Sequence, residues 1–290
     1  MSRTIILGVL AAGLLAPAAA SAQQAGVRVE HAAARLIVIP EPRGNVSVTV
    51  HQGSAGLPPL QVRQEGGVVV VDGGLDRRIE GCTSAHIGIF THREEGQGTY
   101  VRVRGMRAIP VAELPVITAH VPLNARVGAS DAVWGEVGPT SRLDLATAGC
   151  GDWRVADVRG DFHVRMAGSG DVRAASTGAT RAALAGSGDL QLAMVNGGFD
   201  VAISGSGDVH SRIVNGPIAA KIAGSGDVTI DGGQAPNVGV SVVGSGDFNF
   251  HGVAGALAAS VAGSGDVSVA HVTGPVSKRV AGSGDVNVGR

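Results

Sequence analysis

Aspartate recurs in this sequence at a nearly constant interval, always inside a short glycine-rich motif. The motif Gly-Ser-Gly-Asp occurs seven times, and its aspartates follow one another at intervals of about 19 residues. Gly149-Cys150-Gly151-Asp152 extends the series toward the N-terminus by one further interval of the same length. Carboxylates at one point of a repeating unit could hold Ca²⁺ between neighbouring units or cap the backbone N–H groups of a turn. The series comprises Asp152, Asp171, Asp189, Asp208, Asp227, Asp247, Asp266 and Asp285.

The two kinds of chemistry differ in what offsets the negative charge. If the units stack at the strand spacing of about 4.8 Å, adjacent carboxylates repel one another by roughly 1 kcal/mol even at the dielectric of water. We expect turn N–H groups to offset this repulsion, with glycine supplying positive φ. Ca²⁺ between adjacent carboxylates is the alternative. The nine-residue repeat of calcium-binding β-rolls is absent, so we expect no metal and no other cofactor.

Histidine and basic side chains do not follow the repeat. The histidines of the repeats fall at different offsets from their aspartates, which predicts surface histidines and not a metal column. They are His163, His210, His251 and His271. Arg165, Lys221 and Arg279 take outward positions on repeats that are not adjacent, which favours a solvated face over a lyase-type cluster. We therefore expect no catalytic residues.

Two cysteines, Cys82 and Cys150, lie far apart in the chain, and neither has a CxxC or metal-ligand neighbour. In an oxidising compartment such a pair favours a disulfide. On the loop-entropy model this bridge would contribute roughly 4 kcal/mol. Two buried free thiols are the alternative.

The first residues read as a secretory signal. Arg3 supplies the positive start, residues 4–15 are apolar, and Ala20-Ser21-Ala22 is a small-x-small cleavage site. We expect residues 1–22 to be removed near Ala22, which places the mature chain in the periplasm or outside the cell. Later segments are too short or too polar to cross a membrane, so we expect no span after cleavage.

Charge and aromatic content limit the partners. The formal net charge is −1, the isoelectric point is near 6.8, and aromatic residues make up 3% of the chain. These values exclude a basic footprint for nucleic acid and disfavour a platform of rings that stack on bases or sugars.

The repeat itself predicts the elements that position the aspartates. After each aspartate apolar residues alternate, as in Phe248 and Phe250, and a second alternating run precedes the next glycine, as in Phe199, Val201 and Ile203. One repeat unit thus makes two strands and two turns. Stacked units would bury one narrow core, which predicts an all-β, right-handed parallel β-helix over 116–290, with coils of about 19 residues. The segment 128–131 reads as a worn copy of the motif.

Residues 23–115 lack the motif but show the same alternation of strands and turns. Short strands are expected at 35–39, 46–50, 60–63, 68–71 and 100–103. We interpret them as irregular first coils or a β-rich cap that covers the open end of the solenoid. The charged segment 76–98, which contains Cys82, is predicted to be a long loop.

A signal peptide, a β-rich start and Gly-Ser-Gly-Asp-Val recurring to the C-terminus together resemble the putative auto-transporter adhesin head GIN domain family. The resemblance covers roughly residues 35–290. It implies a right-handed β-helix in envelope or secreted proteins, with adhesion inferred for the family and no catalytic residues to carry over. The sequence departs from a true auto-transporter because no membrane barrel follows Arg290.

Three function classes follow. The first is a non-catalytic, adhesin-like binding or structural module of the cell envelope, whose unknown surface ligand could be a glycan. The second is a structural spacer that recognises no partner; in an alternative form of this hypothesis, bound calcium stabilises the spacer. The third is a polysaccharide-active enzyme, a lyase or hydrolase, on a β-helix. A non-repeating patch on one face would favour the enzyme, and a uniform face the first two.

Overall fold

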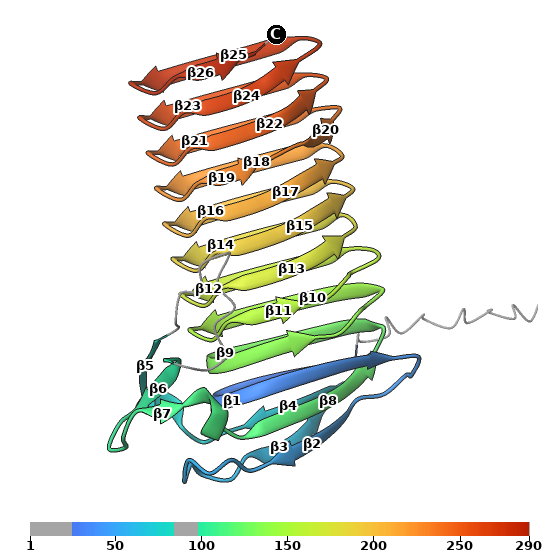
Figure 1. Cartoon of the computed structure of the whole chain (residues 1–290), viewed down its shortest axis with the longest axis vertical. Coiled ribbons are helices and arrows are strands. Elements are labelled where there is room, and N and C mark those ends of the chain that lie inside the picture. The colour runs from blue at the N-terminus through green and yellow to red at the C-terminus, as the bar shows by residue number, and fades with distance from the viewer. Residues whose placement is uncertain (1–24, 84–97, 290) are drawn as a thin grey trace, which may run out of the picture.

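The strands of this chain wind into a parallel β-solenoid. The computed structural model describes residues 25–83 and 98–289, so the predicted signal peptide, residues 1–22, lies outside the described residues. About nine turns, with coils of ~19 residues, stack along the long axis (Figure 1). The helical content is 2%, in the 3-10 turns η1 (Asp76–Arg78) and η2 (Val111–Glu113). The all-β solenoid expected from the repeat is confirmed.

Each coil contributes one strand to each of two parallel sheets. In spatial order the first sheet comprises β4 (Val68–Asp72), the first half of β1 (Gly26–Glu41), the first half of β9 (Asn124–Val137), β10 (Arg142–Gly149), β12 (Phe162–Gly168), β14 (Thr180–Gly186), β16 (Phe199–Gly205), β18 (Ile218–Gly224), β21 (Val238–Gly244), β23 (Leu257–Gly263) and β25 (Val276–Gly282).

The second sheet is built in the same way from the other half of each coil. It comprises β8 (Val116–Pro122), the second halves of β1 and β9, β11 (Trp153–Val155), β13 (Val172–Thr177), β15 (Leu190–Asn196), β17 (Val209–Asn215), β19 (Val228–Ile230) with β20 (Gly233–Ala235), β22 (Phe248–Ala254), β24 (Val267–Val272) and β26 (Val286–Val288).

The core lies between the two sheets and runs the length of the stack. Along β16, Phe199, Val201 and Ile203 are 1%, 0% and 2% exposed, whereas the residues between them face solvent. Phe248 and Phe250 of β22 are fully buried on the opposite side of the same core. Because the pleat alternates sides, the apolar period of two in the sequence becomes one inward row per strand.

The two glycines of each motif have different physical roles. The first, such as Gly205 with φ +140°, has a backbone conformation that L side chains rarely adopt. The second, such as Gly207, lies against the coil before it, and a Cβ there would be 2.3 Å from the carbonyl oxygen of Gly188. The turn therefore requires glycine at both positions.

The N-terminal end of the stack is closed by antiparallel strands. β2 (Ser47–His51) pairs with β8, and β3 (Gln61–Glu65), whose residues are all exposed, pairs with β4. The polar edge of β3 disfavours pairing with another chain. The five predicted strands correspond to β1, β2, β3, β4 and β6, but β1 begins at Gly26, well before the expected start, and forms a complete coil.

A small third sheet packs on the side of the solenoid. Its strands are β5 (Ile79–Thr83), β6 (Tyr100–Val103) and β7 (Ile109–Pro110), in the order β5-β6-β7. Their apolar residues form a second core with Ala33 and Ala132 of the first coils. The prediction of a loop over 76–98 is wrong for 76–83, which form η1 and β5 and place Cys82 in a strand; residues 84–97 lie outside the described residues.

Candidate binding surfaces

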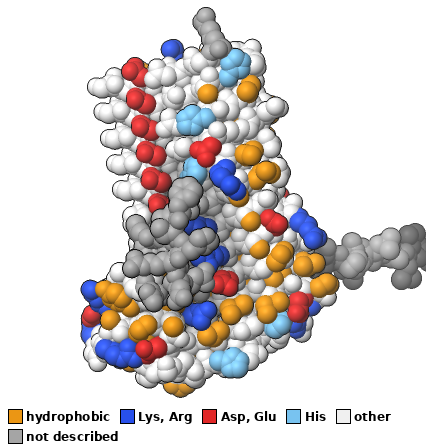
Figure 2. Space-filling model, viewed as in Figure 1, with side chains coloured by type: hydrophobic (Ala, Val, Ile, Leu, Met, Phe, Trp, Pro, Cys, Tyr) orange, Lys and Arg blue, Asp and Glu red, His pale blue; other side chains and the backbone are white. Residues whose placement is uncertain are grey.

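The eight repeat aspartates lie at the turns that join the first sheet to the second. In the upper part of Figure 2, acidic side chains form one column along an edge of the solenoid. From Asp171 to Asp285, each aspartate donates its backbone N–H to the carboxylate Oδ1 of the aspartate one coil earlier. The N···O distances run from 2.7 to 3.2 Å. A hydrogen bond to a charged acceptor contributes about 1.5–3 kcal/mol, which outweighs a repulsion of roughly 1 kcal/mol between neighbours.

Asp131 does not belong to this column, contrary to the interpretation of 128–131 as a worn motif. It pairs in register with Gly149, the first glycine of the next turn, and has a φ of +72°. Its carboxylate Oδ2 accepts a hydrogen bond of 3.0 Å from the backbone N–H of His31, which has a φ of +51°. The pairing of Asp131 with Gly149 could not be inferred from the motif, because the first turns are built without Gly-Ser-Gly.

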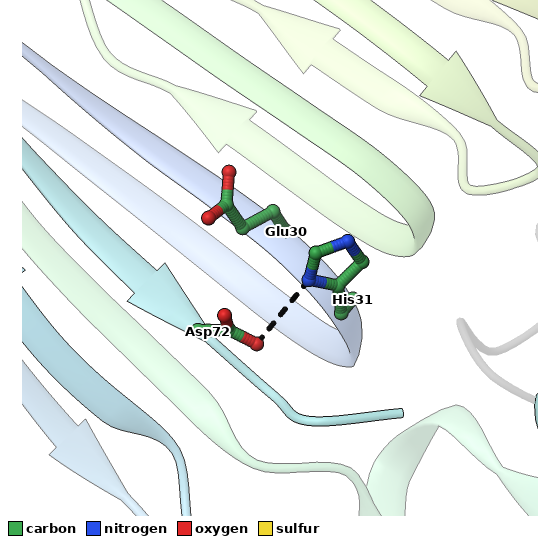
Figure 3. A group of neighbouring side chains, drawn as sticks. All are labelled: Glu30, His31 and Asp72. Atoms are coloured by element: carbon green, nitrogen blue, oxygen red, sulfur yellow. Dashed lines mark ion pairs between the residues drawn. The ribbon is translucent and has the colours of Figure 1, made fainter. Parts of the chain in front are cut away.

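A cluster of charged side chains joins the first coils. Side-chain atoms of Glu30, His31 and Asp72 lie within 4.8 Å of one another, close enough to hold a metal ion (Figure 3). Arg63, however, donates to Glu30 and, at 3.1 Å, to Asp72, and Arg28 donates to the other oxygen of Glu30 at 3.0 Å. The remaining oxygen of Asp72 accepts a hydrogen bond from the backbone N–H of Gly74. Because every carboxylate oxygen of Glu30 and Asp72 thus has an arginine or backbone partner, the cluster is better explained as an ion-pair network than as a metal centre.

Electrostatics in this network favour the ionised carboxylates. The pKa of Asp72 lies below its ordinary value, first because Gly74 N–H bonds the carboxylate and then because of Arg63. The pKa of Glu65 is lowered chiefly by its hydrogen bond from Arg63. The pKa of Arg63 is raised in turn by its three carboxylate partners. β1, β3 and β4 are therefore held together by charge as well as by backbone pairing.

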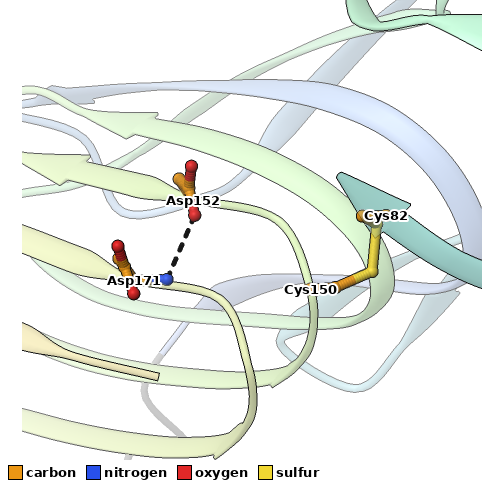
Figure 4. The surroundings of a disulfide bond; sticks show 4 residues. All are labelled: Cys82, Cys150, Asp152 and Asp171. Carbon is orange, nitrogen blue, oxygen red and sulfur yellow. Dashed lines mark hydrogen bonds between the residues drawn. A yellow bond between two sulfur atoms is a disulfide. The ribbon is translucent and has the colours of Figure 1, made fainter. Parts of the chain in front are cut away.

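The predicted disulfide is present between Cys82 and Cys150, with a Cα–Cα distance of 5.7 Å (Figure 4). Cys150 takes the serine position of the first glycine-rich turn, just before Asp152, whose carboxylate accepts the N–H of Asp171 in the same view. The bridge attaches β5 to the start of the column. Beside it, turns of successive coils and residues of β5 line a shallow depression of about 630 Å³.

The four histidines of the repeats do not gather at one place. His163 lies on the first sheet and the other three lie on the second, where His210 pairs with Asp231 at 2.9 Å. Next to His163 is a depression of about 410 Å³ whose lining includes Asp161 and Asp200. Both carboxylates are already in ion pairs, the first with Arg142 and the second with Arg181 at 3.2 Å. These pairs explain the acids of the depression without a catalytic role.

The basic residues expected on an outward face are where the alternation placed them. Arg165, Lys221 and Arg279 are exposed on β12, β18 and β25. Lys278, opposite Ala259 on an inward row, is exposed in the last coil and donates to the carbonyl of Val286 at 3.4 Å. Within 25–83 and 98–289, no helix is long and hydrophobic enough to span a bilayer.

Comparison with known proteins supports the family resemblance. Residues 193–289 match the family described as putative auto-transporter adhesin, head GIN domain, a narrower segment than the 35–290 inferred from the motifs. A crystal structure titled as a putative lipid binding protein from Parabacteroides distasonis is 17% identical, with a TM-score of 0.45 over 92% of this chain and 93% of that chain. A similarity of this size does not bear on function. No curated protein matches the sequence.

Proposed function

We propose that this chain is an extracytoplasmic, non-catalytic binding module of the cell envelope, comparable in role to an adhesin head. The observation that carries the proposal is the unbroken register of the coils. From β10 to β25, every coil of the first sheet pairs residue for residue with the next, and the aspartate bonds repeat at each turn. Such a stack holds outward side chains at fixed intervals over a long surface, which suits recognition of an extended ligand.

Three further features support the proposal. The match over 193–289 is to a family described as an adhesin head. The Cys82–Cys150 disulfide and the signal-like residues 1–22 favour a location in the periplasm or outside the cell. The acids of the depression beside His163, Asp161 and Asp200, have arginine partners, which accounts for their presence on this surface without an acid–base role.

Fractionation of the producing cells, followed by binding of the purified, oxidised residues 23–290 to envelope fragments, tests the proposal. We expect recovery outside the cytoplasm and saturable binding, with a globular protein of similar size and net charge as the negative control. Recovery in the cytoplasm, or the absence of saturable binding, would contradict the proposal. Release of soluble oligosaccharides from added polysaccharides would point to the enzyme instead.

A further inference from the structure

Four cations lie on one straight row of the first sheet's outer face, and each is separated from the next by two coils. The register runs from Arg28 through Gly128 and Ala146 to Arg165, then through Ala183 and Ala202 to Lys221, then through Ser241 and Ser260 to Arg279. A cation therefore recurs at every third strand. At the ordinary strand spacing this interval is about 14 Å. The strands that carry the row follow one another along the long axis in Figure 1.

The side chains between the cations are small, so the row lies on an accessible surface. Between Lys221 and Arg279, the outer face is hollowed into a depression of about 460 Å³. Its other lining includes Ala219, Gly239, Ala258, Ser241 and Ser260. Serine hydroxyls and exposed peptide groups on such a floor can bond a polar chain laid along the row.

The two halves of the row differ in charge compensation. Arg28 is paired with Glu30 and Glu65, and Arg165 with Asp144 at 2.7 Å. For Lys221 and Arg279, no acidic partner lies within ion-pair distance among the described residues. The part of the row with free positive charge is thus the part that borders the depression.

We propose that this face binds a linear acidic polysaccharide along the solenoid axis, with Lys221 and Arg279 pairing with carboxylates of the polymer. The proposal rests on the proposed function and names the ligand class. Each sugar of a polyuronate covers about the length of one coil and carries one carboxylate, so in a chain with a threefold twist the carboxylates on the side that faces the protein recur near every third coil. Arginine suits the planar carboxylate and lysine acts as a point charge. Nucleic acid fits less well, because the face between the two cations offers no aromatic ring for base stacking.

Binding of polygalacturonate to the purified, oxidised residues 23–290 tests the assignment, with methyl-esterified polygalacturonate as the uncharged comparator. We expect measurable binding of the free acid that weakens with salt, and loss of binding on esterification. The double variant Lys221→Ala/Arg279→Ala should weaken binding by about fivefold to tenfold. The matched control is Arg212→Ala, which removes an exposed cation from β17 on the other sheet and should leave the affinity within about twofold of the original.

The outcomes separate this inference from the proposed function. Equal affinity for the acid and its ester, or equal weakening by the control variant, would overturn the assignment of the cation row. Binding of single-stranded DNA or anionic lipid vesicles in preference to the polyuronate would overturn the ligand class. If envelope fragments bind but polygalacturonate does not, the ligand assignment is wrong and the binding function stands. If neither binds, the binding function itself is wrong.

Discussion

Replacing Asp227 in the middle of the aspartate column tests what holds the turns together. The Oδ1 of Asp227 accepts the N–H of Asp247 at 2.7 Å, and its own N–H is donated to Asp208 at 2.9 Å. Alanine removes a charge-assisted bond of about 1.5–3 kcal/mol, but it also relieves repulsion from two neighbours by up to roughly 1 kcal/mol each before screening by salt. Because water can reach the half-buried turn, we expect Asp227→Ala to cost about 1 kcal/mol.

Asparagine at the same position should behave differently. The amide oxygen of Asp227→Asn can still accept the N–H of Asp247, and the neighbour repulsion disappears, so we expect a change of less than about 0.5 kcal/mol. For a domain of this size, about 1 kcal/mol corresponds to a shift of about 2–4 °C in the melting temperature, which circular dichroism resolves. Ser225→Ala, which trims an exposed hydroxyl of the same turn, is the control. An asparagine variant as unstable as the alanine variant would refute the argument that acceptance of the N–H bond is what matters.

Four other perturbations probe the remaining features. Gly207→Ala should lower the free energy of unfolding by about 2–3 kcal/mol, because the added Cβ would meet the backbone of the preceding coil. Ser206→Ala, the control, should not lower it. Equal melting temperatures for the two variants would contradict the close packing of Gly207. Arg63→Met should make the N-terminal coils less stable at pH 7, with a gap that narrows at pH 3. The reason is that the hydrogen bond from Arg63 is the chief cause of the lowered pKa of Glu65, so this carboxylate contributes stability above its ordinary value of 4.5, and the contribution is lost as the pH falls through the lower folded value; a gap that widens in acid would contradict it. If backbone N–H bonds alone stabilise the aspartate carboxylates, a calcium chelator should leave the melting temperature unchanged. A decrease in melting temperature that Ca²⁺ reverses and Mg²⁺ does not would favour the calcium-stabilised spacer. Reduction of the disulfide should destabilise the protein by up to roughly 4 kcal/mol on the loop-entropy model, and no change in the melting temperature would show that the small sheet is held by its apolar contacts.

The regular coils could be predicted from the sequence because each one satisfies the same physical constraints. Inward alternation, two glycines per turn and a bonded aspartate must recur wherever one coil stacks on another, so they leave a visible period. The first coils do not show this period. Asp131 takes a left-handed conformation at the position that the next coil gives to Gly149, and His31 takes one at the shift in register between β1 and β9, so these turns are built from residues that carry no motif. The strand β5 was missed for a related reason, since its partner β6 lies beyond a charged segment and local alternation is absent from Ile-Glu-Gly-Cys-Thr.

Only part of the cation row could be predicted from the sequence. Arg165, Lys221 and Arg279 lie 56 and 58 residues apart (221 − 165 and 279 − 221), which is close to three repeats, whereas Arg28 precedes Arg165 by 137 residues (165 − 28). The sequence separation of successive aspartates varies only between 18 and 20, so the interval survives in the regular coils, but β2 to β7 lie between the first coil and the later ones and displace Arg28 from it. Only the strand register shows that each step is three coils, since variation in length is absorbed at the turns and leaves the paired strands aligned.

A ligand that lies along the solenoid axis would depend on the distance between cations in space, which the strand register sets, and not on their separation in the sequence. Inserting one residue into a turn should therefore leave binding of the polyuronate intact, because the turns already absorb such changes in length. Deleting one whole coil between Lys221 and Arg279 should instead shorten the distance between the two cations by about 5 Å and weaken binding. Titration of both variants with polygalacturonate makes the comparison. Unchanged affinity after the coil deletion would show that the two cations bind independently of their spacing.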